Sequence, residues 1–344
     1  MKFRYLAGTA LALAVGFGVG GADAASVFDA VKQRGSLNCG TDNTAPGFGY
    51  LNTKTGRLEG LDVDFCRAVA AAVLGDPDKV KYVNVTDKSR FNAVQTNQAD
   101  VVFAHTTVKP VRESAIGIDF LPINFYDGTG ALVKAAANIK SFNELDGAAI
   151  CTTQGSGTET TLSAYVRSRK WKTTKVLTFE NLEKVFAALE SGRCDAMVTD
   201  RSALASWRSN APKPDDYVIL KETLAKSPFA GFVAANDSKW RSVLRWVTYA
   251  LFQAEEFGIT TANLGEHLKS EDPFEQKFLG VKGGFGKDFG LPDDFLVTTI
   301  KAVGNYGEIY DRNLGPKTPY GLERAGTPNA PFYNGGLMYS PPWN

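Results

Sequence analysis

The sequence predicts an α/β protein made of two similar lobes. About 320 residues remain after the N-terminal export signal described below, and this length exceeds what one hydrophobic core usually fills. An internal repeat supports two halves, because Phe91–Val102 and Phe186–Met197 each read as a helix end, a polar turn and the start of a buried strand. Upstream of each copy, a short apolar segment ends in a cysteine and a Gly/Thr-rich loop follows. Chance similarity between two common helix–strand joints is the alternative interpretation.

Residues 1–24 have the composition of a secretory signal peptide. Two basic residues precede an apolar run over residues 5–19, and Ala22-Asp23-Ala24 fits the small-x-small cleavage pattern. The run is shorter than the roughly 20 residues that span a bilayer. We therefore expect export of a mature chain that starts near Ala25.

Removal of this signal balances the charge of the chain. Lys+Arg falls from 38 to 36 and Asp+Glu from 37 to 36, because Lys2, Arg4 and Asp23 are lost. A net charge of zero provides neither a basic footprint for nucleic acid nor a polybasic patch for a membrane surface. No nucleic-acid partner is expected.

The chain has four cysteines, Cys39, Cys66, Cys151 and Cys194, and an even number in an exported chain favours disulfides. Three pairings are possible. The repeat places two cysteines in each half, so Cys39–Cys66 and Cys151–Cys194 is the favoured pairing. With only two histidines and no CxxC pair, neither a zinc site nor any cofactor is predicted.

Helical periodicity is clearest in three segments. Apolar residues recur at helical spacing over residues 61–73, and Gly75 ends that helix. Asn181 is predicted to cap a helix over residues 182–189. A third helical pattern runs from about Trp240 to Phe257. The following chain becomes loop-rich, and its Pro-, Gly- and aromatic-rich end predicts an extended arm packed on one lobe.

Several of these segments resemble a known family. Gly60–Ala70, Arg90–Val94 and Thr107–Arg112 are similar to signature segments of the polar amino-acid-binding proteins of ABC importers, the periplasmic solute-binding proteins of family 3. The cysteine-bearing forms of these motifs, together with Trp246–Glu256 and Val303–Ile309, resemble the longer general L-amino-acid-binding subfamily. The resemblance extends from about Gly35 to the C-terminus.

The resemblance implies a type II periplasmic-binding-protein fold, in which two hinge crossings join the lobes. Lobe 1 would comprise residues 25–131 and 234–344, with the C-terminal helices and arm, and lobe 2 residues 132–233. The hinge candidates are Gly130–Lys134 and Phe229–Ala234, where apolar strand-like segments separate the repeated halves.

The family's carboxylate-binding residues fall on the first lobe. Arg112 matches the family's carboxylate-binding arginine, and a guanidinium fork suits an α-carboxylate because it offers two parallel charge-assisted hydrogen bonds. Thr107 would add a hydroxyl and a backbone N–H, and His105 would contribute mainly backbone contacts. The alternatives are a surface Arg112 paired with Glu113 or Asp119, and a pH-sensitive or buried polar His105.

Three further positions complete the set of residues that the resemblance implies for holding the ligand's carboxylate and ammonium groups, called the clamp below. Asp200 matches the family's ammonium-binding carboxylate and follows a strand, where open α/β sheets bind ligands. Gly157 lies in a Gly-rich loop whose N–H groups favour an anion, although the family commonly has Thr there. Asp42 is the first-lobe candidate for the ligand's ammonium or side chain. A helix N-cap for Asp200, a tight turn at Gly157 and an Asx-type turn at Asp42 are the alternatives.

The side-chain pocket is less well defined by the resemblance. Phe48 and Tyr126 are candidates for its walls, with core packing as the alternative. The subfamily usually has Trp where Val108 stands, so the side-chain preference of this chain is expected to differ while the clamp remains.

The implied function is a periplasmic receptor, monomeric, that closes over a free L-amino acid and delivers it to the permease of an ABC importer. Ligand binding would shift an open–closed equilibrium by its greater affinity for the closed form. A periplasmic dehydratase-like enzyme and a ligand-presenting chemosensory subunit are the alternatives. An enzyme is not expected, since the sequence lacks a second catalytic residue beside His105 and Asp42, a GxSxG elbow, an HExxH motif and a phosphate loop.

Overall fold

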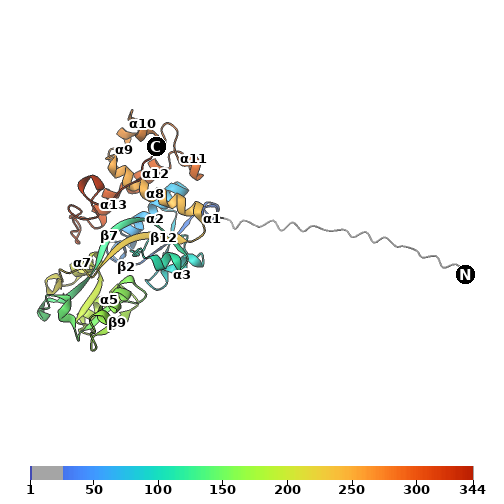
Figure 1. Cartoon of the computed structure of the whole chain (residues 1–344). Helices are drawn as coiled ribbons and strands as arrows, with labels where there is room; N and C mark the ends of the chain where they lie inside the picture. Colours follow the sequence, from blue (N-terminus) through green and yellow to red (C-terminus); the bar gives the residue numbers. More distant parts are fainter. Residues whose placement is uncertain (2–25, 344) are drawn as a thin grey trace.

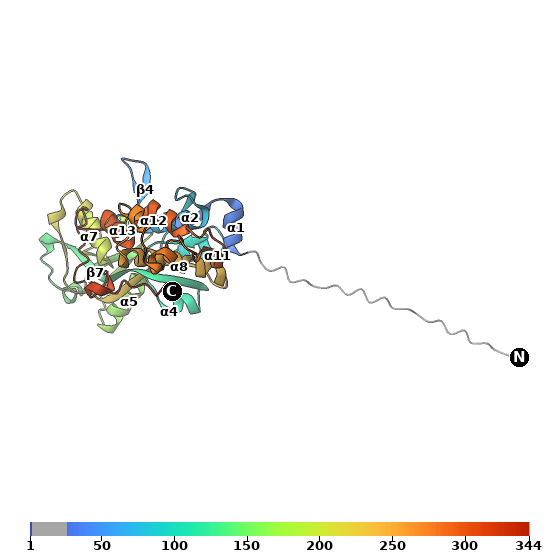
Figure 2. The ribbon, with the colours of Figure 1, turned by 90° about the horizontal axis from the view of Figure 1, so that it is seen from above.

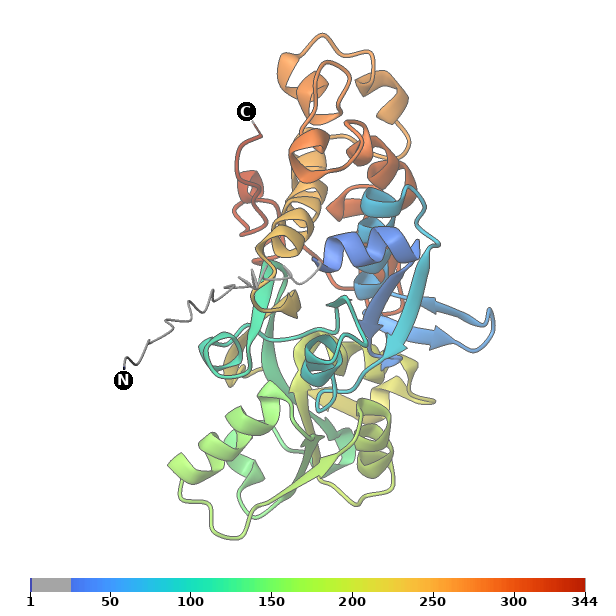
Figure 3. The same cartoon turned by 90° about the vertical axis from the view of Figure 1, so that its right-hand side faces the viewer.

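The computed structural model describes Met1 and residues 26–343, and the predicted signal peptide otherwise lies outside the described residues. Two lobes are connected by a pair of long strands, β7 and β12 (Figures 1 and 3). The strands are β1 (Leu37–Thr41), β2 (Thr44–Ala45), β3 (Gly49–Asn52), β4 (Arg57–Glu59), β5 (Val80–Asn84), β6 (Val101–Val102), β7 (Ile118–Lys134), β8 (Ala149–Thr153), β9 (Lys175–Phe179), β10 (Ala196–Asp200), β11 (Tyr217–Ile219) and β12 (Ala225–Ala234). The helices are α1 (Val27–Arg34), α2 (Leu61–Leu74), α3 (Arg90–Gln95), α4 (Pro110–Ser114), α5 (Gly157–Ser168), α6 (Leu182–Glu190), α7 (Arg201–Asn210), α8 (Ser238–Glu256), α9 (Leu264–His267), α10 (Pro273–Phe278), α11 (Gly286–Phe289), α12 (Phe295–Val303) and α13 (Tyr306–Asn313).

The main sheet has the same strand arrangement in both lobes. Its order is β5-β1-β6-β12-β7-β10-β8-β9, with β11 paired to β7. In the first lobe β5, β1 and β6 run parallel, and in the second lobe β9, β8 and β10 do so. Each set ends on an antiparallel crossing strand, β12 in the first lobe and β7 in the second. The carboxyl ends of the parallel strands are the edges where open α/β sheets bind ligands.

The internal repeat appears in the structure as two matching pairs of hydrogen bonds. Asp100 accepts a bond of 2.7 Å from the N–H of Asn38, and its own N–H donates to the Asn38 carbonyl. Asp195 accepts a bond of 2.7 Å from the N–H of Ala149, and its own N–H donates to the Ala149 carbonyl. In each lobe, the aspartate that follows the helix therefore fixes the start of the neighbouring parallel strand.

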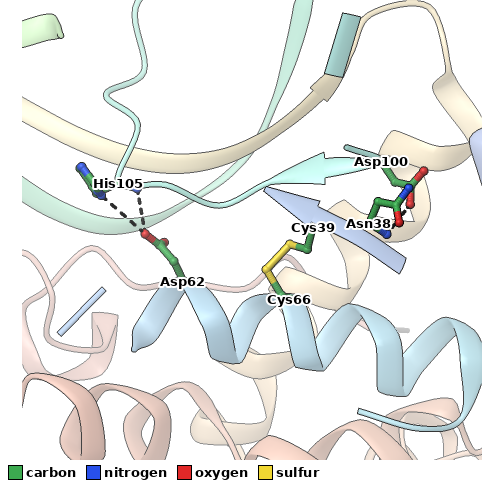
Figure 4. The surroundings of a disulfide bond; sticks show 6 residues. All are labelled: Asn38, Cys39, Asp62, Cys66, Asp100 and His105. Carbon is green, nitrogen blue, oxygen red and sulfur yellow. Dashed lines mark hydrogen bonds and ion pairs between the residues drawn. A yellow bond between two sulfur atoms is a disulfide. The ribbon is translucent and has the colours of Figure 1, made fainter. Parts of the chain in front are cut away.

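One disulfide stabilises each lobe. Cys39 of β1 is bonded to Cys66 of α2, with the two Cα atoms 6.0 Å apart (Figure 4). Cys151 of β8 is bonded to Cys194, just before β10, with the Cα atoms 5.9 Å apart. This is the pairing that the repeat favours, and it ties a helix or turn to a central strand within each half.

The two crossing strands pair with each other along most of their length. Register runs from Ala225 opposite Thr129 to Ala234 opposite Ile118. The predicted hinge segments lie in these strands. Residues 130–133 of the first segment pair with β10 of the second lobe, and Phe232 of the second segment pairs with Val102 of β6 in the first lobe. The stretch between these pairings, around Phe125, lies nearer the midpoint of the crossing.

The two longest helices follow the predicted patterns. Helix α2 is buried on almost every side by α12, β1 and α8, which its small alanine side chains permit, and it ends at Gly75 with a positive φ of 72°. Helix α8 begins after Asp237, whose side chain accepts a hydrogen bond of 2.9 Å from the Trp240 N–H. The Trp240 indole donates to the Asp100 carbonyl at 2.7 Å, which joins α8 to the first-lobe sheet.

Two peripheral features complete the fold. The β3–β4 hairpin extends from the first lobe (Figure 2). The C-terminal arm packs against the first lobe and a crossing strand. Arg324 forms an ion pair with Glu255 of α8, and Asn329 exchanges two hydrogen bonds, of 2.7 and 2.8 Å, with the backbone of Tyr126 in β7. No helix in the described part of the chain is long and apolar enough to cross a membrane.

Candidate ligand-binding site

A narrow cavity lies between the two lobes. Its walls are mostly polar and come from both halves of the repeat. The lining residues are Asp87, Arg90, His105 and Thr107 from the first lobe, and Thr153, Ser156, Gly157, Thr158, Leu182, Thr199 and Asp200 from the second. Four of the six predicted ligand-binding residues, His105, Thr107, Gly157 and Asp200, are therefore brought together here.

Arg112 lies directly behind the Thr107 wall of this cavity. Only 4% of its surface is exposed, and Nη1 donates a hydrogen bond of 2.5 Å to the Thr107 carbonyl. Its guanidinium stacks on Phe91, 5.0 Å from the ring centroid. Burial and the neighbouring Arg90 lower the pKa of Arg112 to about 9, while Asp87 and Asp200 act in the opposite direction.

The surface ion pairs considered for Arg112 do not form. Asp119 pairs instead with Arg241 at 3.5 Å, and Glu113 accepts a backbone hydrogen bond from Phe120. Within the described residues Arg112 has no carboxylate partner. Burial of a cation without an anion costs free energy, and a negatively charged group bound beside Arg112 would offset this cost.

Thr107 lies at the junction of the first lobe and β12. It is buried, it forms an isolated antiparallel bridge with Phe229, and its hydroxyl shares a hydrogen bond of 2.9 Å with that of Ser227. The short helix α4 starts just after it, with Pro110 at its first turn, and returns Arg112 to the Thr107 carbonyl.

Asp200 supplies the negative side of the cavity. It is the last residue of β10 and precedes α7, yet its side chain makes no capping hydrogen bond to that helix. Only 7% of its surface is exposed, and its Oδ1 atom is buried with no hydrogen-bond partner among the described residues. Burial raises the pKa of Asp200. The N-cap alternative is thus not realised, and the carboxylate lacks a cation.

Gly157 is the first residue of α5. The side chain of Ser156 caps this helix by accepting a hydrogen bond of 2.9 Å from the Glu159 N–H, which leaves the preceding N–H groups of the first turn without helical partners. Gly157 and Thr158 both line the cavity. This geometry places the positive end of the helix dipole beside the cavity that Thr107 and Asp200 also line.

His105 lies between two carboxylates, Asp42 and Asp62. Figure 4 shows its contact with Asp62. Its backbone N–H donates a hydrogen bond of 2.9 Å to Asp62. Its Nε2 atom lies 3.9 Å from Asp42 Oδ2, and its Nδ1 atom lies 3.9 Å from Asp62 Oδ2. The backbone of His105 has a positive φ of 35°, which is rare for a side-chain-bearing residue. Burial raises the pKa of Asp62 to about 6, and it also raises the pKa of Asp42.

Asp42 does not line the cavity between the lobes. Its Oδ1 atom accepts hydrogen bonds from the N–H and the hydroxyl of Thr44, at 2.7 and 2.8 Å. The Asx-type turn is therefore formed. The ligand role of Asp42 stays a prediction.

The structure adds Asp87 and Arg90, which the sequence did not identify as site residues. They form an ion pair of 2.6 Å, and Arg90 is only 2% exposed. Left to burial alone, the pKa of Asp87 would rise, but Arg90 and neighbouring donors hold it below its usual value. Thr153 of β8 donates to Asp87 across the cavity at 2.6 Å. The Arg90 motif of the family resemblance was the only available signal.

Phe48 and Tyr126 do not form the walls of this cavity. Phe48 is buried and packs edge-on against Phe125 and Phe229. Tyr126 lines a separate cavity between the crossing strands and the C-terminal arm, and so does Val108. The departure from the family at Val108 therefore lies outside the cleft.

The chemistry that these groups support is ligand binding through charge and hydrogen bonds. No group of three or more His, Cys, Asp or Glu residues suited to a metal ion occurs in the described residues. A helix N-terminus and a buried carboxylate line one space, and the buried Arg112 cation lies behind its Thr107 wall. This arrangement matches a ligand with one negative and one positive end.

This fold and site define a class. The chain belongs to the bacterial extracellular solute-binding proteins, family 3, whose family model matches residues 37–257. Members of this family are solute-binding receptors, and the chain is accordingly a receptor and not an enzyme.

Particular relatives resemble nearly the whole chain. It is 41% identical to the general L-amino acid-binding periplasmic protein AapJ of Rhizobium johnstonii, over 99% of both chains. It is 42% identical to the glutamate/glutamine/aspartate/asparagine-binding protein BztA of Rhodobacter capsulatus, over 94% of this chain and 95% of that one. A solved periplasmic binding protein from Brucella ovis with glutathione bound superposes with a TM-score of 0.88 and 42% identity, over 93% and 99% of the two chains.

Proposed function

We propose that this protein is a periplasmic receptor that closes over a free L-amino acid and delivers it to the permease of an ABC importer. The observation that carries the proposal is a pair of opposite buried charges on opposite lobes. Arg112 of the first lobe has no carboxylate partner, and Asp200 of the second has no cationic partner, within the described part of the chain. A zwitterionic α-amino acid would satisfy both at once.

The mechanism follows from this division of the clamp. The α-carboxylate would bind Arg112, Thr107 and the N–H groups at Gly157, and the ammonium would bind Asp200. Because the partners belong to different lobes, the ligand has more contacts in the closed form and shifts the equilibrium toward it. The crossing strands around Phe125 would bend as the lobes separate.

The lobe boundaries and the partners belong to the same proposal. Residues 25–131 with 234–344 would move as one lobe and residues 132–233 as the other. The mature protein would act as a monomer in the periplasm, and the permease would recognise its closed form. The names of two relatives, both amino-acid-binding proteins, support the amino-acid ligand of this proposal.

A thermal-shift screen would test the proposal. Mature protein would be unfolded and refolded to remove any carried-over ligand and then heated with each common L-amino acid. Binding to the folded state raises the melting temperature by mass action, so at least one amino acid should stabilise the protein while its D-enantiomer does not. No response to any amino acid would contradict the proposal.

A further inference from the structure

Lys109 is a second cation of the cleft that lacks a carboxylate. It lies between Thr107 and Arg112 and reaches across to the other lobe, where Nζ donates a hydrogen bond of 2.9 Å to the Gly157 carbonyl. In the described part of the chain it forms no ion pair. Partial burial and the neighbouring Arg112 lower the pKa of Lys109, while Asp200 raises it, so Lys109 lies within electrostatic range of both ends of the proposed clamp.

The absence of a side chain at Gly157 makes room for this lysine. A Cβ atom at position 157 would lie 3.2 Å from Cε and Nζ of Lys109 and 3.2 Å from the Thr107 hydroxyl. A branched side chain such as the threonine that the family commonly has would crowd the lysine. The lack of a side chain at Gly157 therefore permits the contact of Lys109 across the cleft.

The two unpaired cations exceed what one α-carboxylate can neutralise. Arg112 is the better α-carboxylate partner, because its planar fork suits two parallel hydrogen bonds. The Lys109 ammonium is a compact point charge that now donates to a neutral carbonyl. A hydrogen bond between two charged groups is stronger than one to a neutral acceptor, so an anion in the closed cleft would displace this contact.

We propose that Lys109 binds a second carboxylate of the ligand, and that the receptor prefers ligands carrying an α-amino-acid group and an additional carboxylate over their neutral amides. This inference rests on the proposed function of the same cleft. Acidic amino acids and γ-glutamyl peptides such as glutathione share this chemistry.

Isothermal titration calorimetry with pairs of nearly isosteric ligands would test the inference. L-Glutamate would be compared with L-glutamine, and L-aspartate with L-asparagine, on wild-type protein and on Lys109→Met. We expect wild type to bind the acid at least about tenfold more tightly than its amide, and Lys109→Met to remove most of that preference. Lys88→Met removes a positive charge from an exposed residue that lies close to Gly155 of the other lobe, and it should leave the preference unchanged. Glutathione would be titrated alongside, because a Lys109-dependent affinity for glutathione in place of glutamate would identify a peptide as the source of the second carboxylate.

Two outcomes would overturn the inference while leaving the proposed function intact. One is equal wild-type affinity for an acid and its amide. The other is an equal loss of affinity for both in Lys109→Met, which would make Lys109 only a contact that holds the lobes closed. Absence of binding by every amino acid tested would instead contradict the proposed function itself.

Discussion

The hydroxyl of Thr153 donates a hydrogen bond of 2.6 Å to Asp87, and this bond joins the second lobe to the first. Asp87 is held in place by Arg90, which is itself almost fully buried. The Lys109–Gly157 contact crosses the same gap. The closed arrangement thus has polar contacts of its own, which would add to those that a ligand makes.

Thr153→Val should weaken binding of every ligand by a similar factor. Valine keeps the shape of threonine but cannot donate to Asp87, so the closed form loses a charge-assisted hydrogen bond. A net value of about 1–2 kcal/mol for such a bond corresponds to roughly 5- to 30-fold in affinity. Titration calorimetry with two different amino acids would measure the change. Thr248→Val is the control, because the Thr248 hydroxyl donates within α8, to the Leu244 carbonyl. A loss of affinity in Thr153→Val that differs between ligands would instead indicate that Thr153 contacts the ligand directly.

Arg112→Ala should lower amino-acid affinity at least about 100-fold. The variant removes two charge-assisted hydrogen bonds to the α-carboxylate, each with a net value of about 1.5–3 kcal/mol. Arg112→Lys should fall between wild type and Arg112→Ala, because it keeps the charge without the fork. Arg241→Ala, which removes an exposed arginine paired with Asp119, should bind normally. Near-normal affinity in Arg112→Ala would refute its role in the site.

Asp200→Asn separates ligand binding from helix capping. The Asp200 side chain makes no capping hydrogen bond, so the melting temperature should stay constant or rise as an unpaired buried carboxylate is neutralised. Affinity for amino acids should fall at least about tenfold, because the ammonium loses its counter-charge. Asparagine caps helices about as well as aspartate, so Asp200→Ala tests capping separately. Unchanged affinity in Asp200→Asn, with a loss of about 1 kcal/mol in the unfolding free energy of Asp200→Ala, would favour the capping role.

The Asp62 carboxyl should make stability depend on pH. Its folded-state pKa is raised to about 6 from 3.8, so the folded protein retains the proton at pH values where the unfolded chain has lost it. The contribution of Asp62 to stability is therefore greatest below pH 3.8 and decreases as the pH rises through about 6.

Asp62→Asn provides the reference for this effect, since an amide resembles the protonated carboxyl and its oxygen can accept from the His105 N–H. Urea unfolding of both proteins across this pH range would measure the difference. The wild type should lose on the order of 2–3 kcal/mol relative to Asp62→Asn as the pH rises. A pH-independent difference would contradict the raised pKa.

The helices and the two-lobe plan could be predicted because their signals are local. The pattern over residues 61–73 became α2 (Leu61–Leu74), and that from Trp240 to Phe257 became α8 (Ser238–Glu256). Apolar periodicity and end residues lie within each segment, so no distant contact was needed.

The full set of residues that line the cleft could not be predicted, because it depends on contacts between distant parts of the chain. Asp87 lies in the site because Thr153, 66 residues away, meets it across the gap. Tyr126 faces the other cavity, with its backbone bonded to Asn329, 203 residues away. Contacts of this kind decide which side of a crossing strand faces the cleft. The residue pattern within the strand does not reveal these distant partners.

A crystal structure with the amino acid that binds most tightly would test the central claim most directly. The account predicts a closed protein in which the ligand's α-carboxylate meets Arg112, Thr107 and the N–H groups at Gly157, and its ammonium meets Asp200. A ligand bound in the reverse orientation, or outside the space between the lobes, would contradict it.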